Sequence, residues 1–135
     1  MEKVIKTEDQ WREELSPEAY AVLRRQATEP PFTGKYTYDK TAGVFRCAGC
    51  NAEIFRSDDK FDSGCGWPSF THAAHPEAVE LIEDRSHGMV RTEVRCAQCG
   101  GHLGHVFDDG PRDKGGMRYC INSCALTLDA NSASA

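Results

Sequence analysis

Cys47-Ala48-Gly49-Cys50 and Cys96-Ala97-Gln98-Cys99 are two copies of one short pattern, and the fold depends on how they come together. Two residues between a pair of cysteines allow a tight turn to aim both sulfurs at one point. Two such turns that face each other supply four thiolates in a tetrahedron. Thiolate is a soft ligand that suits zinc, and four protein ligands leave no open position for chemistry. The pattern therefore predicts one structural Zn²⁺ ion bound by Cys47, Cys50, Cys96 and Cys99, with a single iron ion as the alternative.

The separation of the two pairs indicates what the ion does. Residues 51–95 lie between them, whereas the pairs of a small zinc ribbon stand about 15–20 residues apart. We therefore expect the ion to hold two distant β segments of one domain together. A redox dithiol in each pair is the alternative, and the recurrence of two similar pairs favours the structural site.

Length and charge exclude several classes of protein. The 135 residues fit one domain, 1–135, with a core at about 7–128 and a flexible tail of small and polar residues at 129–135. The net charge of −5 disfavours binding to nucleic acid. No apolar run approaches the roughly 20 residues of a membrane span, and the first residues lack the apolar segment of a secretory signal. We expect a cytoplasmic protein with no nucleic-acid or membrane partner.

The N-terminal segment is predicted to be helical and the remainder to be β. Thr7 and Gln10 form a possible capping box, Ser16-Pro17 begins a second helix, and Glu29-Pro30-Pro31 ends it. Short β-favouring segments separated by glycine-containing turns then follow. These segments are 35–38, 44–47, 89–96, 103–107 and 117–121. The pattern predicts a mainly antiparallel β domain with a short N-terminal helical segment.

Cys120 lies in the last of these expected strands. Side chains alternate along a strand, so Arg118, Cys120 and Asn122 are predicted to share a face. A neighbouring cation lowers the pKa of a thiol, so Cys120 is a candidate thiolate near neutral pH. A buried cysteine without any chemical role is the alternative from these residues alone.

Two histidines follow the second cysteine pair. His102 and His105 would point to opposite faces of a regular strand, but a bulge at Gly104 would bring both to one side. Because four cysteines already complete a tetrahedron, we predict an acid–base role for the histidines, with metal ligation as the alternative.

Three segments together resemble the B-type methionine sulfoxide reductases. They are Gly66-Trp-Pro-Ser-Phe70, His102-Leu-Gly-His-Val-Phe-Asp-Asp-Gly-Pro111 and Arg118-Tyr-Cys-Ile-Asn-Ser123, in this order and together with the four metal cysteines. The resemblance extends from about Trp11 to Leu128. It implies two antiparallel sheets, structural zinc far from the catalytic centre, and reduction of methionine-R-sulfoxide in peptides and proteins.

The resemblance also implies roles for individual residues. Cys120 is the expected nucleophile and Cys65 the resolving thiol, so that a sulfenic acid on Cys120 becomes a disulfide, which thioredoxin reduces. The other residues expected in catalysis are His102, His105, Asp108, Asp109, Asn122 and Arg118. The residues expected to bind substrate are Trp67, Phe70, His105 and Asn122, with the indole of Trp67 against the sulfoxide methyl group.

Cys124 departs from the family pattern, in which a small residue such as alanine is usual. We interpret it as a small buried hydrophobic residue. If the chain turned helical after Asn122, Cys124 would neighbour Cys120 and become an alternative resolving thiol. Two other functions remain: a zinc-stabilised binding module, which the acidic charge disfavours, and a thiol–disulfide oxidoreductase that uses Cys65 and Cys120 without a sulfoxide substrate.

Overall fold

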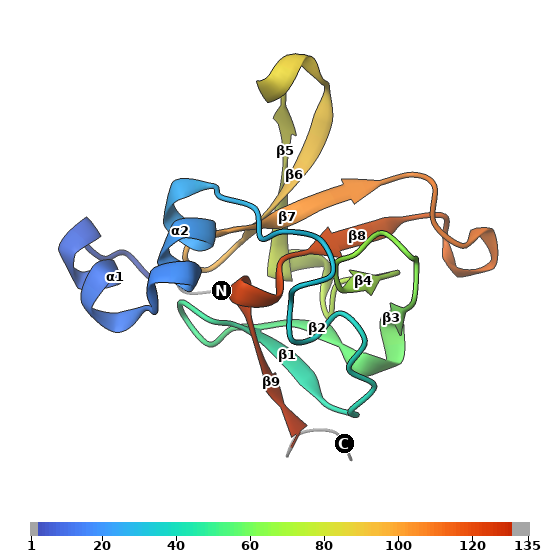
Figure 1. Cartoon of the computed structure of the whole chain (residues 1–135), viewed down its shortest axis with the longest axis horizontal. Coiled ribbons are helices and arrows are strands. Elements are labelled where there is room, and N and C mark those ends of the chain that lie inside the picture. The colour runs from blue at the N-terminus through green and yellow to red at the C-terminus, as the bar shows by residue number, and fades with distance from the viewer. Residues whose placement is uncertain (1–2, 131–135) are drawn as a thin grey trace.

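Figure 1 shows the computed structural model, which describes residues 3–130 apart from the side chain of His87. The helices are α1 (Glu8–Glu14) and α2 (Pro17–Arg25). The strands are β1 (Val44–Cys47), β2 (Glu53–Arg56), β3 (Lys60–Phe61), β4 (Ser69–Phe70), β5 (Val79–Asp84), β6 (Arg91–Cys96), β7 (His102–Phe107), β8 (Arg118–Ile121) and β9 (Leu126–Asp129). Single turns of 3₁₀ helix lie at Ser57–Asp59, Pro76–Ala78, Ser86–Gly88, Arg112–Lys114 and Ser123–Ala125.

Both helices begin where the sequence predicts. Thr7 and Gln10 form a reciprocal capping box at α1, and the Ser16 hydroxyl accepts from the backbone N–H of Ala19 at α2. The end of α2 differs from the prediction. Gln26 adopts a left-handed conformation (φ 59°) and closes the helix before the expected stop at Glu29-Pro30-Pro31 is reached.

The strands form two antiparallel sheets, which confirms the predicted fold class. One sheet has the order β2-β1-β9 and the other β3-β4-β8-β7-β6-β5. Figure 1 shows the β5–β6 hairpin projecting away from the rest of the domain, with α1 and α2 at one side. No helix among residues 3–130 has the length and apolar character needed to cross a membrane.

One predicted strand is wrong. Residues 35–38 form turns and bends, and Tyr36 is buried with its ring edge-on to Phe45 at a centroid distance of 5.5 Å. The aromatic residues there indicate burial of the ring, and sequence alone cannot separate this from strand pairing. The strands β2, β3, β4, β5 and β9 were not among the predicted segments.

The last strand extends one residue beyond Leu128, the expected end of the ordered core. Asp129 pairs with Val44 in the β1–β9 ladder, and its carboxylate accepts from Arg46 Nε at 3.1 Å. The predicted start of the flexible tail, residue 129, is therefore too early in the chain. Residues 131–135 of the expected tail lie outside the described part of the chain.

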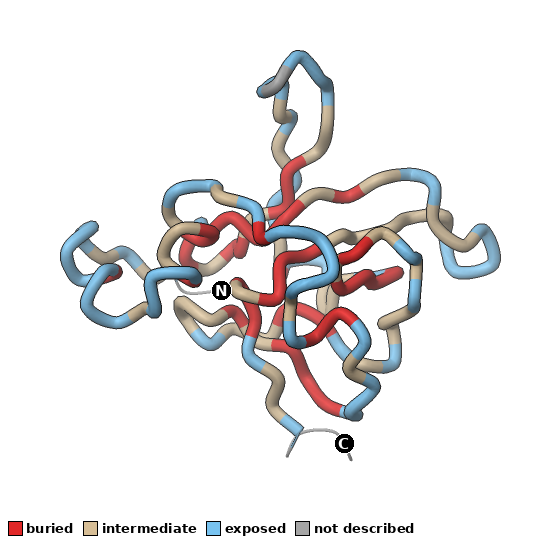
Figure 2. The backbone as a smooth tube through the Cα atoms, viewed as in Figure 1, coloured by how far each residue is buried: buried red, intermediate tan, exposed pale blue. Residues whose placement is uncertain are grey.

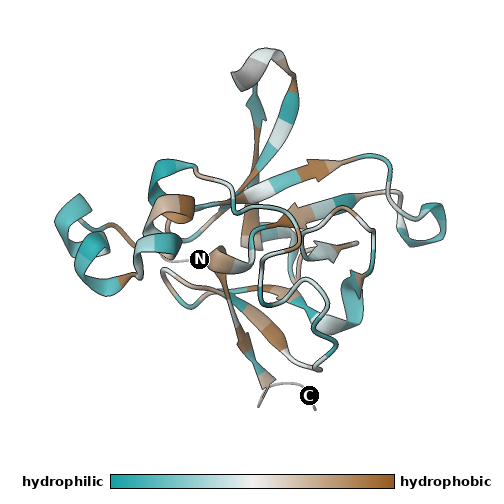
Figure 3. Ribbon diagram, in the orientation of Figure 1, coloured by the Kyte–Doolittle hydropathy of each residue, from teal (hydrophilic) through white to brown (hydrophobic). Residues whose placement is uncertain are grey.

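The hydrophobic core lies between the two sheets. Figure 2 shows buried segments gathered there, and Figure 3 shows hydrophobic stretches on β1, β7, β8 and α2. Phe45, Phe55 and Phe70 are fully buried, and the rings of Phe55 and Phe70 stack at 4.4 Å. These aromatic contacts hold β4, and with it β8, against the smaller sheet.

A bulge in β7 brings the two histidines together. Val94 pairs with Gly104 but Arg95 pairs with His102, so Leu103 is the extra residue on β7. The rings of His102 and His105 consequently lie 5.5 Å apart. The predicted bulge is confirmed, one position from the expected glycine.

Gly104 is required for the close approach of β7 and β8. A Cβ atom at this position would lie 2.1 Å from the backbone oxygen of Cys120. We predict that Gly104→Ala forces the strands apart and lowers the free energy of unfolding by about 1–3 kcal/mol or more, measured by urea denaturation.

Gly101→Ala is the matched control for this substitution. Its added methyl group would meet side-chain atoms first, Leu23 Cδ2 at 2.8 Å and Cys99 Sγ at 3.3 Å, whereas that at Gly104 meets the backbone of the paired strand. An equal or larger loss of stability in Gly101→Ala would contradict the assignment of this constraint to Gly104.

Candidate active site and metal centre

The four predicted metal cysteines converge. Their sulfur atoms all lie within 4.8 Å of one another. The Sγ atoms of Cys47 and Cys99 are 3.7 Å apart, and those of Cys50 and Cys96 are 3.5 Å apart. Four thiolates at this spacing repel one another unless a cation lies between them, and an all-sulfur tetrahedral set fits Zn²⁺. This group can therefore hold a metal ion.

The two cysteine turns share one local geometry. The backbone N–H of Asn51 donates to Cys47 O, and that of Gly100 donates to Cys96 O, each at 2.8 Å. Asn51 and Gly100 have positive φ angles of 67° and 75°, a conformation that these two residue types tolerate best. Each strand therefore ends in a turn that aims two sulfurs at the same point.

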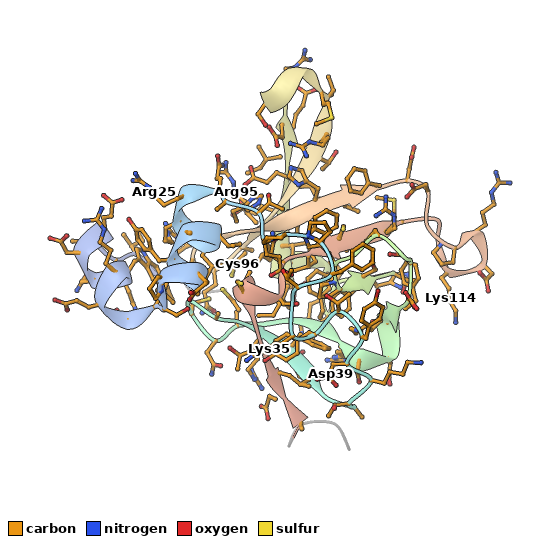
Figure 4. The ribbon with its side chains drawn as sticks, viewed as in Figure 1. Arg25, Lys35, Asp39, Arg95, Cys96 and Lys114 are labelled. Carbon is orange, nitrogen blue, oxygen red and sulfur yellow. The ribbon has the colours of Figure 1, made fainter. Side chains whose placement is uncertain are left out.

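The N-terminal helices cover this centre. Arg24 donates from NH1 to Cys99 O at 2.9 Å, and its guanidinium lies 4.7 Å from the Trp11 ring centre. Figure 4 shows Cys96 beside α2, whereas Lys114 marks the β7–β8 connection on the opposite side of the molecule. The centre thus lies among packed structural elements.

Loss of one of these thiols tests the metal assignment. Cys47→Ser should lose the ion and unfold at a much lower temperature. A structural zinc ion binds with an apparent free energy on the order of 10 kcal/mol, comparable with the whole stability of a domain. Metal analysis and calorimetry measure the two effects. Cys124→Ser, a thiol outside the cluster, should retain the metal, and a Cys47→Ser variant with full metal content would refute the site.

A cavity of about 230 Å³ contains most of the other predicted residues. Its lining comes from the segment after α2, from the Cys65 loop and from three adjacent strands. The lining residues are Thr28, Cys65, Trp67, Arg91, Gly104, His105, Phe107, Arg118, Cys120 and Asn122. Of the predicted set, Cys65, Trp67, His105, Arg118, Cys120 and Asn122 are thus brought together.

Two thiols meet in this cavity. The Sγ atoms of Cys65 and Cys120 are 3.3 Å apart, although 55 positions separate them in the chain. Cys120 lies on β8, where it pairs with Ser69, and Cys65 lies in the loop that precedes β4. The β4–β8 pairing therefore brings the two sulfurs into contact.

The first thiolate of the pair forms on Cys65. Burial opposes its ionisation, but hydrogen bonds from Ser63 and Ser69 outweigh burial and lower the pKa of Cys65 to about 7. Burial and the adjacent Cys65 raise the pKa of Cys120, and Arg118 only partly offsets them. The predicted effect of Arg118 is present, but it is not the dominant influence.

We predict that alkylation of Cys65 by iodoacetamide accelerates as the pH rises through about 7, where its thiolate forms. Ser63→Ala removes a donor 3.0 Å from the sulfur, so the midpoint should move to higher pH. Peptide mapping identifies the modified residue. Ser57→Ala, in a 3₁₀ turn away from the cavity, should leave the midpoint unchanged. A midpoint that is the same in all three proteins would contradict this explanation.

Glu29 joins two residues of the cavity through its backbone. Trp67 Nε1 donates to Glu29 O at 2.9 Å, and Glu29 N donates to Asn122 Oδ1 at 3.0 Å. The Asn122 amide also donates to Leu103 O at 3.0 Å. These bonds fix the indole and the amide relative to the thiols.

The histidines contact carboxylates other than those predicted. His105 Nε2 lies 2.8 Å from Asp84 Oδ2, and His102 Nδ1 lies 2.6 Å from Glu93 Oε2. His102 is only 4% exposed, and burial lowers its pKa. It is not among the residues lining the thiol cavity, and it packs beside His105 instead.

The expected role of Asp108 and Asp109 beside the histidines is corrected by these contacts. Asp109 accepts from Arg118 Nε at 2.8 Å and from its NH2 at 3.2 Å, and Asp108 is exposed. The guanidinium lies 4.6 Å from the Phe107 ring centre. Asp109 therefore orients Arg118 at the cavity wall.

Comparison with known proteins identifies the family. A family model described as the SelR domain matches residues 15–130. The chain belongs to this family, the B-type methionine sulfoxide reductases. The protein is accordingly an oxidoreductase that reduces methionine-R-sulfoxide.

Curated relatives of this reductase carry the name peptide methionine sulfoxide reductase MsrB. That of Bradyrhizobium diazoefficiens is 62% identical over 95% of this chain and 91% of its own length. That of Leifsonia xyli is 58% identical over 92% of this chain and 89% of its own length. A solved structure titled Crystal Structure of Mis18 'Yippee-like' Domain matches with a TM-score of 0.51 and 22% identity, over 65% of this chain and 95% of that one. This last likeness concerns the fold alone.

Two further expectations about the reductase are changed by the structure. Phe70, expected to contact substrate, has no exposed surface and stacks on Phe55 in the core, so its ring does not reach the cavity. Cys124 is half-buried rather than fully buried, and this partial burial, followed by the nearby Glu29 carboxylate, raises the pKa of its thiol to about 11. The chain does turn after Asn122, but Cys124 lines a different cavity from Cys120.

Sequence reasoning missed Thr28, Arg91 and Phe107 of the cavity lining. It also missed Glu29, Asp84 and Glu93, which contact lining residues or the histidines. A signal for two of them exists. Arg91, Glu93 and Arg95 alternate along one predicted strand, so they share a face. Charged residues repeated on one face of a strand next to the histidine strand indicate a polar surface there. Glu29 and Asp84 act from outside those strands, and their contacts depend on tertiary structure.

Proposed function

We propose that this reductase works through a sulfenic acid on Cys120, which Cys65 then converts to a disulfide. The observation that carries this mechanism is the 3.3 Å contact between the two sulfur atoms in a cavity that also contains a histidine and an indole. A second thiol within contact distance allows the sulfenic acid to condense as soon as it forms.

The first step consumes one proton. The thiolate of Cys120 attacks the sulfoxide sulfur, the oxygen takes a proton, and methionine leaves while Cys120 becomes –SOH. Two electrons pass from the Cys120 sulfur to the substrate sulfur. Because the resting thiolate is on Cys65, the proton of Cys120 moves to Cys65 across their hydrogen bond before the attack.

The surrounding side chains suit this step. His105 is the proposed proton donor to the sulfoxide oxygen, since imidazole can carry the proton near neutral pH. Trp67 offers its ring face to the methyl–sulfur group. Asn122 and Arg118 contribute donors at the cavity wall. The ring of His102 packs edge-on against the ring of His105 at a centroid distance of 5.5 Å.

The second step forms the Cys65–Cys120 disulfide. The Cys65 sulfur attacks the Cys120 sulfur, and the hydroxyl group leaves with a proton as water. We propose thioredoxin as the dithiol that returns the pair to free thiols by exchange. Because each cycle must regenerate free thiols, a reducing cytoplasm is the proposed location. Zn²⁺ held by Cys47, Cys50, Cys96 and Cys99 maintains the fold of one catalytic domain spanning 1–135.

Thiol–disulfide exchange in addition to sulfoxide reduction is the second candidate, because the Cys65–Cys120 contact also suits simple dithiol exchange. Only sulfoxide reduction transfers an oxygen atom from a substrate. Stereospecific consumption of a sulfoxide therefore measures that reaction alone.

The test measures turnover of the separated R and S epimers of a methionine sulfoxide peptide, with dithiothreitol as reductant. Wild type should reduce only the R epimer, and Cys120→Ser should be inactive. In a separate reaction without any reductant, Cys65→Ser should release about one methionine per enzyme and retain a dimedone-reactive sulfenic acid on Cys120. Cys124→Ser, the matched control, should remain active.

Two results would overturn the mechanism. Equal rates on both epimers, or an active Cys120→Ser variant, would exclude Cys120 as a stereospecific nucleophile. A Cys120–Cys124 disulfide after turnover without reductant would transfer the resolving role from Cys65 to Cys124.

A further inference from the structure

Asp84 stands at the end of β5, two strands away from the strand that carries His105. Its Oδ2 atom nevertheless lies 2.8 Å from His105 Nε2. The same oxygen lies 3.5 Å from Arg91 NH2, and Oδ1 accepts from Ser86 N at 2.9 Å. Three residues therefore bind this carboxylate: His105, Arg91 and Ser86. The β5–β6 hairpin contributes Arg91 to the cavity lining.

The chemistry of this pair fixes the position of a proton. The hydrogen bond from His105, followed by those from Ser86, holds the pKa of Asp84 well below its usual range. An ionised carboxylate can only accept a hydrogen bond, so Nε2 of His105 must donate. In the neutral ring Nδ1 then carries no proton, and it is the atom that gains and gives one. His105 lines the cavity that contains Cys65 and Cys120.

We propose that Asp84 is a positioning residue that fixes the tautomer of His105, so that Nδ1 is the ring nitrogen that delivers the proton to the sulfoxide oxygen. This inference rests on the proposed acid role of His105. Asp84 does not line the thiol cavity, and it acts only through the imidazole. Rotation of the imidazole ring would break the hydrogen bond from Nε2 to Asp84. The carboxylate therefore restrains the ring in one orientation.

The fold supports this role independently of the reaction. Asp84 is the last residue of β5, in register with Arg91 at the first position of β6. The short 3₁₀ turn at Ser86–Gly88 follows, and its first N–H bonds Asp84 directly. Hairpin closure and the orientation of His105 therefore depend on the same carboxylate.

The test substitutes Asp84→Asn, which keeps the shape but loses the charge. Since a positioned acid contributes about 100-fold to 10,000-fold in rate, we expect kcat for the R epimer to fall at least about 10-fold, with little change in KM. Glu83→Gln, the adjacent carboxylate that pairs with Arg85 on the surface, is the matched control and should retain wild-type kcat.

Two measurements separate positioning from a structural effect. ¹⁵N NMR of the His105 ring should show Nε2 protonated in the neutral wild type, and a changed tautomer ratio in Asp84→Asn. In a His105→Gln background, Asp84→Asn should cause no further loss of kcat, because its effect passes through the imidazole.

The proposal is overturned if Asp84→Asn keeps full kcat, if the tautomer of His105 is unchanged, or if the loss is equally large without His105. These outcomes are distinct from failure of the proposed function. The NMR measurement needs no turnover, and an inactive wild type or an active Cys120→Ser variant would refute the sulfenic acid mechanism while leaving the tautomer result intact.

Discussion

The convergence of four cysteine sulfurs is the constraint on which the rest of the structure depends. Cys47 ends β1 in the three-stranded sheet, and Cys96 ends β6 in the six-stranded sheet. A metal ion held by these sulfurs would therefore join the two sheets at one point, and α2 packs over that point. The stacked rings of Phe55 and Phe70 lie between the two sheets and hold β4, with its neighbour β8, against the smaller sheet. The thiol cavity is lined by residues of β6, β7 and β8 in the larger sheet and by the Cys65 loop.

The residues of the thiol cavity come from paired strands and from a loop. Cys120 and His105 face each other across the β7–β8 ladder, so their relative position is set by backbone pairing. Cys65 comes from a loop, where the hydroxyl groups of Ser63 and Ser69 stabilise its thiolate. The two sulfurs therefore differ physically. Cys120 is half-buried on strand β8, whereas hydrogen bonds in a loop lower the pKa of Cys65.

Short-range chemistry explains why much of this could be predicted from the sequence. The turn within each Cys-x-x-Cys pair, the helix caps and the bulge beside Gly104 each depend on residues a few positions apart, and the structure contains all of them. Asp108 and Asp109 show where such reasoning fails. They are close to His105 in sequence, but the carboxylates that reach the histidines come from β5 and β6 across the sheet. Their pairing depends on strand order, which no local pattern specifies.

The backbone of Glu29 links the cavity to a segment outside the two sheets. It holds Trp67 and Asn122 from an irregular segment that precedes the sheets and contributes Thr28 to the cavity. Both bonds use the backbone of Glu29, so a change of side chain at this position leaves the bonding groups in place. A change in the path of this segment would move Trp67 and Asn122 together. The geometry of the cavity therefore depends on the backbone of an irregular segment as well as on the sheet.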